Sequence, residues 1–253
     1  MRILVACEFS GTVRDAFRAR GHDAVSCDLL PTEAPGLHYC GDVSDVLDGW
    51  FPVYFQSDCD PDGDGWCQTT DSDASDCTCF GPTQDGIEYI EKNGVLFGRP
   101  ESAPGWDMLI AFPPCTYLCG SGLHWNKRRP ERATMTEQGA AFFLALANAD
   151  IPRIAIENPV GIMSTTYRKP DQIIQPYQFG HDASKATCLW LKGLPKIRPT
   201  AFVEPRIVNG RPRWSNQTDS GQNKLPPSAT RSNERARTYL GVAEAMADQW
   251  GIA

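Results

Sequence analysis

The sequence predicts an α/β fold with a mostly parallel sheet and helices on both faces. Short apolar runs that suit buried parallel strands alternate along the chain with segments of helical periodicity. The 253 residues are 41% apolar and 22% charged, a composition that provides one sizeable core and excludes a disordered or fibrous chain. We therefore expect one α/β domain over residues 1–253.

The first strand–helix–strand unit comes at the start of the chain. Residues 3–7 are a continuous apolar run, which predicts a buried strand, and the run stops at residues 8–11, Glu-Phe-Ser-Gly. Apolar residues recur at helical spacing over 13–20, and a second strand over 24–27 ends at Asp28. A glycine turn after one strand and an acid at the tip of the next are typical of a nucleotide-binding sheet.

A change of composition predicts an insertion over residues 57–104, which is rich in Asp, Gly, Cys, Thr and Ser. We expect an acidic, cysteine-rich subdomain there. Its cysteines are candidate ligands of one structural zinc ion, but they lack paired C-x2-C spacing, so unligated thiols remain the alternative. An Asp-rich stretch over 60–71 mimics a calcium loop without flanking helices. The four candidate zinc ligands are Cys59, Cys67, Cys77 and Cys79.

The α/β pattern resumes after the insertion. An apolar run over 107–112 predicts a strand that ends at Pro113-Pro114-Cys115, and a strand over 153–156 is expected to end at Glu157-Asn158. The other expected elements are a helix over 132–149, strands near 173–174 and 187–191, a mobile surface loop over 205–230, and a closing loop and helix over 232–250.

The charge is distributed unevenly. Residues 1–91 hold 18 acidic and 4 basic residues, whereas residues 92–253 hold 13 acidic and 20 basic ones, and the total is −7. A broad cationic surface for duplex DNA is therefore not expected in the first third. The ten cysteines, the absence of an apolar run of about 18 residues and the polar start predict a cytoplasmic chain with reduced thiols and no contact with a membrane.

The expected strand ends contain chemically useful side chains. In an open α/β sheet a ligand lies at the carboxyl ends of the strands, near the point where the strand order reverses. The four ends here are residues 8–11, Asp28, residues 113–115 and Glu157-Asn158. A glycine turn, an acid, a cysteine and a glutamate are thus expected around one crevice.

These residues, in this order, resemble the cytosine-C5 methyltransferases that use S-adenosylmethionine. Residues 8–11 are similar to the family's cofactor loop, residues 112–115 to its Pro-Cys nucleophile motif, and residues 157–159 to its Glu-Asn motif. The resemblance implies a Rossmann-like class I methyltransferase fold. It also implies cofactor contacts from Glu8, Phe9, Ser10, Gly11, Asp28, Asp42 and Pro113, catalytic roles for Cys115 and Glu157, and substrate contacts from Pro114 and Asn158.

The chemistry of cytosine explains why a cysteine and a glutamate are needed together. C5 is a poor nucleophile, but addition of a thiolate to C6 makes C5 enamine-like, so that it can attack a sulfonium methyl group. The resemblance gives the thiolate role to Cys115. The addition moves electrons toward N3, where a carboxyl group can stabilise the developing charge. The resemblance gives this role to Glu157.

The sequence departs from the family in two places. Val13 stands where a second glycine is common, and the arginine-rich motif after the Glu-Asn strand is not recognisable. We therefore expect other basic residues to contact the pyrimidine and its phosphate. The candidates are Arg168 and Lys185 first, with Lys169, Arg128 and Arg129.

A recognition region of a hundred or more residues, usual in members that act on DNA, has no room between Leu191 and Arg231. We therefore expect a free deoxycytidine nucleotide (dCMP or dCTP) as acceptor, as in an enzyme that helps to modify phage genomes in the host cytoplasm. The alternative is a DNA methyltransferase, acting on single- or double-stranded DNA, in which the insertion or the 205–231 loop replaces that region. A further alternative is a metal-binding interaction protein on a degenerate methyltransferase scaffold. The cations of the loop are Arg206, Arg211, Arg213 and Lys224.

Overall fold

The computed structural model describes residues 1–52, 66–67, 72–73, 86–92, 95–102, 104–228 and 230–252. They belong to two compact units, one formed by residues 1–43 and 107–253 and the other by residues 44–106. The expected insertion, 57–104, lies within the second unit.

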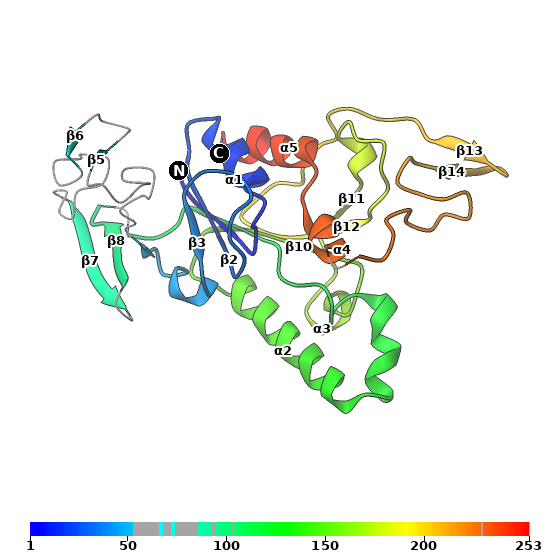
Figure 1. Cartoon of the computed structure of the whole chain (residues 1–253), viewed down its shortest axis with the longest axis horizontal. Coiled ribbons are helices and arrows are strands. Elements are labelled where there is room, and N and C mark those ends of the chain that lie inside the picture. Colours follow the sequence, from blue (N-terminus) through cyan, green and yellow to red (C-terminus); the bar gives the residue numbers. More distant parts are fainter. Residues whose placement is uncertain are drawn as a thin grey trace. The chain divides into compact units, whose positions relative to one another are not determined.

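The first unit is built on a seven-stranded sheet in the order β11-β12-β10-β9-β1-β2-β3 (Figure 1). The five strands from β10 to β3 are parallel, and β12 and β11 are antiparallel additions at one edge. This topology confirms the predicted α/β fold. The strands are β1 (Arg2–Ala6), β2 (Asp23–Asp28), β3 (His38–Cys40), β9 (Met108–Ala111), β10 (Arg153–Pro159), β11 (Gln172–Ile174) and β12 (Thr187–Lys192).

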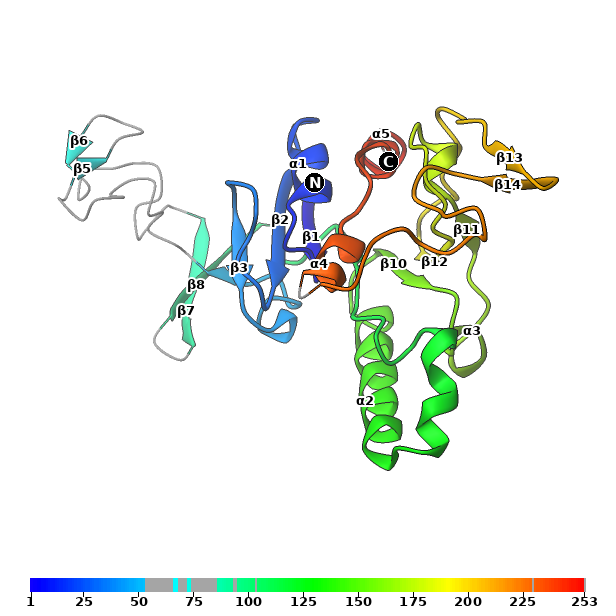
Figure 2. The ribbon, with the colours of Figure 1, turned by 45° about the vertical axis from the view of Figure 1, so that its right-hand side comes forward.

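Helices cover both faces of this sheet (Figure 2). α1 (Thr12–Arg18) and α5 (Leu240–Trp250) pack on the face that carries Ile3 and Val5 of β1, and Trp250 is fully buried there. On the opposite face, α2 (Pro130–Ala147) places Phe143 edge-on to Trp190 of β12, with ring centroids 5.1 Å apart. Burial on both faces explains why the central strands are continuous apolar runs.

Three boundaries differ from those expected. β10 continues through Glu157 and Asn158, because these residues pair with Leu189 and Cys188 of β12. α2 begins at Pro130, since proline suits the first turn of a helix. The closing segment forms two helices, α4 (Arg231–Ala236) and α5. The remaining short elements of this unit are α3 (Met163–Thr166), η3 (Gly120–Lys127) and η4 (Pro176–Gln178), with η1 (Val43–Asp45) at the unit boundary.

The prediction of a mobile loop over 205–230 was wrong for its first part. β13 (Arg206–Val208) and β14 (Arg211–Arg213) form an antiparallel hairpin. Asn209 and Gly210 connect them with φ values of 51° and 72°. Asn-Gly is the residue pair that a two-residue hairpin turn favours, so the sequence contained this signal.

The second unit contains a three-stranded sheet, in the order β4-β8-β7, and a two-stranded one. Trp106 is buried in this unit and donates its indole N–H to the Val46 carbonyl at 2.6 Å. The expected zinc and calcium sites lie outside the described residues, apart from the backbone of residues 66–67. The strands are β4 (Phe51–Pro52), β5 (Trp66–Cys67), β6 (Ser72–Asp73), β7 (Ile87–Lys92) and β8 (Val95–Pro100).

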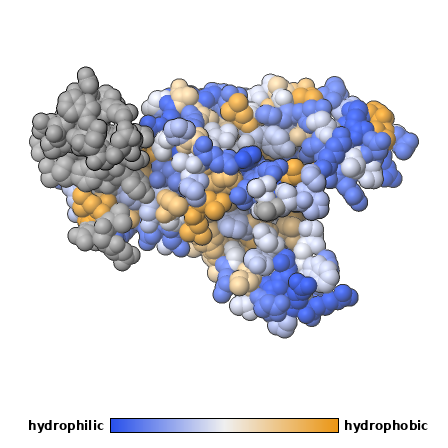
Figure 3. All heavy atoms as spheres, in the orientation of Figure 1, coloured by the Kyte–Doolittle hydropathy of each residue, from blue (hydrophilic) through white to orange (hydrophobic). Residues whose placement is uncertain are grey.

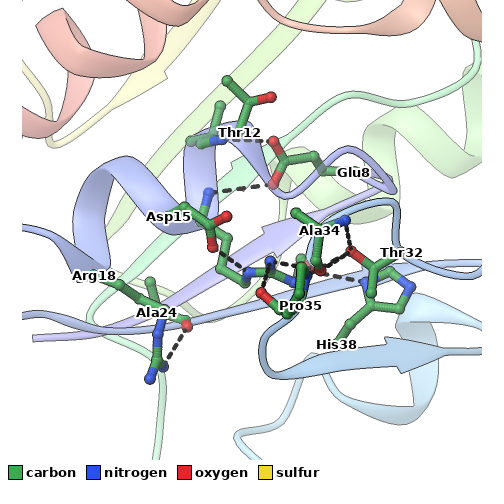
Figure 4. Close-up of polar contacts among 12 residues, drawn as sticks. Glu8, Thr12, Asp15, Arg18, Ala24, Thr32, Ala34, Pro35 and His38 are labelled. Atoms are coloured by element: carbon green, nitrogen blue, oxygen red, sulfur yellow. Dashed lines mark hydrogen bonds and ion pairs between the residues drawn. The ribbon is translucent and has the colours of Figure 1, made fainter.

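A buried arginine fixes the start of the sheet. Arg14 of α1 is fully buried, and its guanidinium donates to Ser26 Oγ of β2 and to the carbonyls of Ala34 and Pro35 (Figure 4). Its Nε lies 2.7 Å from Asp15 Oδ1. A charge of this kind is stable in the interior only because each donor has a partner. Arg14 thereby holds the loop after β2 against α1.

We expect Arg14→Met to lower the free energy of unfolding by about 2–4 kcal/mol, because the two carbonyls lose their donors and remain partly buried. Urea unfolding followed by circular dichroism measures this. The matched control is Arg18→Met on the same helix, since Arg18 is exposed and, among the described residues, donates one side-chain hydrogen bond, to Ala24 O. Equal losses in the two variants would contradict the role given to Arg14.

Candidate functional site

The strand order reverses between β1 and β9. The chain proceeds from β1 outward to β2 and β3, and after the second unit it returns to β9 on the other side of β1. The carboxyl ends of these two strands, Cys7-Glu8 and residues 112–115, therefore lie side by side, where such sheets bind their ligands.

One hydrogen bond joins the cysteine loop to the glutamate strand. Asn158 of β10 is 1% exposed and donates Nδ2 to the Pro113 carbonyl at 2.7 Å. Cys115 follows two residues later and is exposed. Since Glu157 is the neighbour of Asn158, this bond sets the position of the Cys115 loop relative to the carboxylate. The structure thus brings together the cysteine and the glutamate predicted from the sequence.

We expect Asn158→Ala to lower the free energy of unfolding by about 1–3 kcal/mol, because the buried Pro113 carbonyl loses its donor. Urea unfolding measures the loss. Asn148→Ala is the control, since Asn148 is exposed at the end of α2 and its replacement is expected to cost about 0.5 kcal/mol or less. A cost no larger than that of the control would show that the bond contributes nothing.

Glu157 lines a pocket at this edge of the sheet. Lys185, Thr187 and Thr238 contribute further polar side chains, and Phe112 and Tyr239 contribute aromatic walls. Burial raises the pKa of Glu157, while Lys185 and Thr187 act in the opposite direction. The net upward shift favours a carboxyl group that holds its proton and can donate a hydrogen bond.

The Cys115 thiol is electrostatically coupled to the same pocket. Although part of Cys115 is exposed, desolvation by the surrounding protein is the largest cause that raises the pKa of its thiol. The negative charge of Glu157 and then Cys119 also raise this pKa, whereas Lys185 lowers it. Protonation of Glu157 removes the carboxylate charge that opposes the thiolate. The arrangement therefore links a proton on Glu157 to ionisation of Cys115.

Lys185 is held between two distant parts of the chain. It precedes β12, whose antiparallel pairing brings Thr187 opposite Pro159 at the end of β10. Its Nζ donates to the Arg235 carbonyl in α4 at 2.9 Å. In the first turn of α5, Gly241 approaches the Phe179 carbonyl so closely that a Cβ would collide with it, which explains glycine at this position. The last segment of the chain thus closes over the pocket.

In the loop after β1, the side chain of Glu8 is bound within the protein, whereas a contact with the cofactor was expected. Glu8 is 3% exposed, and its carboxylate accepts from the backbone N–H groups of Val13 at 2.6 Å and Arg14 at 3.2 Å. It therefore caps α1, which accounts for Glu8 without a ligand. Gly11 has a φ of 73°, and a Cβ there would collide with Arg14.

An acidic cluster lies beside this loop. Burial raises the pKa of Cys7 to about 12, with further upward contributions from Asp28 and Asp42, so the three side chains are close. Burial also raises the pKa of Asp28, whose Oδ1 accepts from Leu30 N at 2.9 Å. Leu29, next to Asp28, is 75% exposed.

The other predicted cations do not join the pocket. Arg168 pairs with Asp171 at 2.6 Å and donates to the Leu191 carbonyl at 2.8 Å, so its guanidinium fixes the β11–β12 edge. Arg128 and Arg129 lie over the ring of Trp125 at 5.7 and 5.3 Å. Among the predicted cations, Lys185 alone is among the residues that line the pocket.

Within the described part of the chain, no group of three or more His, Cys, Asp or Glu side chains is arranged to hold a metal ion. The same residues include no helix long and apolar enough to cross a membrane.

No protein-family model matches the chain, and a search of curated proteins finds no relative. Among solved structures, the chain is similar to a prophage-encoded E. coli protein provisionally assigned as a DNA modification methyltransferase, with a TM-score of 0.38 and 12% sequence identity. The match covers 82% of this chain and 53% of the other, so this chain spans about half the length of that protein.

Proposed function

We propose that the chain transfers a methyl group from S-adenosylmethionine to C5 of a cytosine, through a covalent bond between Cys115 Sγ and C6. The observation that carries this proposal is the meeting of Cys115 and Glu157 at one edge of the sheet, beside Lys185. A nucleophile and a proton donor are the two groups that addition to a pyrimidine requires.

The proposed steps use these side chains in order. Cys115, which is exposed, loses its proton to solvent water, favoured by the positive charge of Lys185, and the thiolate adds to C6. The electrons of the C5–C6 double bond move toward N3, which takes the Glu157 proton, and C5 becomes nucleophilic. C5 gains the methyl group as the bond from the methyl carbon to the donor sulfur breaks, and the C5 proton leaves to a base. Elimination then restores the C5–C6 double bond, returns the N3 proton to Glu157 and releases the Cys115 thiolate.

The loop and acidic cluster fit a nucleoside-containing methyl donor. S-adenosylmethionine supplies an electrophilic methyl group on a positively charged sulfur. The Asp28 carboxylate retains acceptor capacity for two ribose hydroxyls beyond its bond to Leu30 N, and exposed Leu29 offers an apolar surface to a base. Asp42, like Asp28, acts electrostatically on Cys7, so its negative charge would favour a cationic ligand beside this loop. Glu8 acts in this proposal through its cap on α1.

Two acceptors fit this chemistry, a free deoxycytidine nucleotide and DNA, and different features of the chain favour each of them. The short segment between Leu191 and Arg231 favours a free deoxycytidine nucleotide, whose phosphate Lys185 would meet. The ordered hairpin β13–β14 within that segment favours the alternative, DNA. We take DNA as the acceptor for the reason developed in the next subsection.

A trapped intermediate tests the reaction. Fluorine in place of hydrogen at C5 cannot leave as a cation, so elimination is blocked and the cysteine remains bonded to the base. We would incubate the protein and S-adenosylmethionine with long mixed-sequence DNA that contains 5-fluorocytosine or, separately, with 5-fluorodeoxycytidine monophosphate. Peptide mass spectrometry is expected to find the adduct on Cys115 and to require the methyl donor for a stable methylated product.

Absence of an adduct with both acceptors would overturn the proposed mechanism, and an adduct on another cysteine would overturn the assignment of Cys115. Cofactor binding without any adduct or methyl transfer would instead favour a degenerate scaffold that serves in interactions.

A further inference from the structure

We infer that the hairpin β13–β14 is a binding surface for duplex DNA, which its arginine face contacts in the major groove. This inference deepens the proposed function by choosing between its two acceptors. The hairpin projects from the body of the first unit beyond β11 and β12 in both views (Figures 1 and 2), and its surface is mainly hydrophilic (Figure 3).

The strand register collects three arginines on one face. Arg206 pairs with Arg213, and Val208 pairs with Arg211. Directly opposed residues share a face of an antiparallel ladder, and so do residues two apart, so Arg206, Arg211 and Arg213 point to the same side. Ile207 and Pro212 occupy the other side.

This arrangement does not stabilise the hairpin. Like charges directly opposite each other destabilise a two-stranded ladder. Asp219 offsets part of the repulsion, because Arg206 contacts its carboxylate at 2.5 Å and Arg213 donates to its backbone carbonyl at 3.0 Å. Arg211 is exposed and, within the described residues, forms no ion pair. Arg206 and Arg213 thus have structural partners, whereas Arg211 has no charged partner among the described residues. An exposed arginine of this kind, beside two others on the same face, indicates a polyanionic partner.

The charge of the whole segment agrees with this assignment. Residues 202–237 hold seven basic and three acidic residues, a net charge of +4 within a chain of net charge −7. Such a local excess attracts a phosphate backbone even when the whole protein is acidic.

The base of the hairpin is rigidly attached to the part of the chain that carries Lys185. Trp214 follows β14, is buried and stacks on Tyr177 with ring centroids 4.2 Å apart. Asn216 exchanges two hydrogen bonds with the backbone of Ser184, each 3.0 Å long. The residue after Ser184 is Lys185 of the pocket. DNA held on the hairpin is thus connected to the site through a short, ordered segment.

The shape of a two-stranded ribbon selects the nucleic acid. The major groove of B-form DNA is about 12 Å wide and admits a two-stranded β-ribbon, whose arginines can bind guanine edges or phosphates. The major groove of an RNA duplex is deep and too narrow for side chains to read. The hairpin therefore favours duplex DNA over duplex RNA.

Salt-dependent binding tests the inference. We would measure the affinity of the full chain for a fluorescently labelled 30-base-pair DNA duplex by anisotropy, between 50 and 200 mM KCl. If Arg211 contacts a phosphate, Arg211→Ala is expected to weaken binding and to reduce the slope of log K against log[salt] by about 0.9. If Arg211 instead binds a guanine edge, the loss is expected to be tenfold or more and to depend on sequence.

The matched control is Lys192→Ala, which removes the same charge from an exposed residue paired with Ile154, at the opposite end of β10 from the pocket. The inference is overturned if the wild-type protein does not bind the duplex at 50 mM KCl, if both variants bind equally, or if duplex RNA binds as tightly as duplex DNA.

This test separates the inference from the proposed function. A protein that forms the Cys115 adduct with the free nucleotide but does not bind DNA would retain the proposed chemistry and lose the hairpin assignment. A protein that binds duplex DNA through Arg211 and forms no adduct would give the reverse result. Measuring binding without S-adenosylmethionine keeps the two outcomes independent.

Discussion

Cys115→Ala is expected to abolish methyl transfer, with a loss of about 10⁴-fold or more. The reason is that the proposed reaction has no route to a nucleophilic C5 without a thiolate on C6, and removal of a catalytic nucleophile costs about 10⁴- to 10⁶-fold in comparable cases. Transfer of labelled methyl groups from S-adenosylmethionine to DNA measures the loss. The 5-fluorocytosine adduct is expected to disappear from the same variant.

The control is Cys119→Ala. Cys119 lies on the same loop, but its Sγ is 2.9 Å from Ser121 Oγ and is engaged there. We expect this variant to keep methyl transfer within a few-fold of the wild type, and to bind S-adenosylmethionine as well as Cys115→Ala does. Full activity in Cys115→Ala would refute the assignment of the nucleophile, and loss of cofactor binding in both variants would indicate damage to the loop instead.

The order of the α/β elements followed from periodicity because the central strands are buried on both faces. The run at residues 3–7 and the run before Pro113 are apolar at almost every position, and such runs leave few other places for the chain to lie. Their adjacency at the reversal of strand order follows from the connection rules of these sheets. The juxtaposition of Cys115 and Glu157 could therefore be anticipated from the chain alone.

The sequence did not show which partners the polar side chains bind in the folded chain. Glu8 was expected to contact a cofactor, but it caps α1, and Arg168 was a candidate for the substrate phosphate, but it is bound to Asp171. Lys185 was one of several cations in the sequence, and only the antiparallel return of β12 brings it to Glu157. Bonds between residues far apart in the chain depend on side-chain positions that no local pattern encodes.

The hairpin β13–β14 illustrates a local signal that composition concealed. The high content of Pro, Asn, Ser and Gln favoured a mobile loop, whereas the Asn209-Gly210 pair specified a turn and the buried Trp214 anchored it. One well-packed aromatic side chain is enough to order a short polar segment, because its burial offsets the entropy of fixing a few residues.

Glu157→Gln is expected to change two measurements in opposite directions. Methyl transfer should fall by about 10²- to 10⁴-fold, because glutamine fills the same space but cannot pass a proton to N3. The Cys115 thiol should become more reactive at pH values above the raised pKa of Glu157, because there the wild type carries the negative charge that helps to raise the pKa of Cys115, and the variant does not. Alkylation of Cys115 by iodoacetamide, followed by peptide mass spectrometry across a pH series, measures the second change.

Stability provides an independent test of the protonation of Glu157. Its pKa is raised in the folded state, so the folded chain binds this proton more tightly than the unfolded chain does. The free energy of unfolding of the wild type should therefore fall as the pH increases from the ordinary carboxyl pKa through the raised value, and Glu157→Gln should lack that part of the decline. Urea unfolding of both proteins at several pH values measures the difference.

Glu137→Gln is the matched control for both measurements, since Glu137 is exposed on α2. It is expected to leave methyl transfer, Cys115 alkylation and the pH dependence of stability unchanged. A Glu157→Gln protein that alkylates more slowly at Cys115 than the wild type would contradict the coupling, because loss of a nearby negative charge can only favour the thiolate. Misfolding of Glu157→Gln could also give a more reactive thiol in a less active protein, because it would expose Cys115. It would not, however, leave a protein that unfolds cooperatively and differs from the wild type in the pH dependence of its stability.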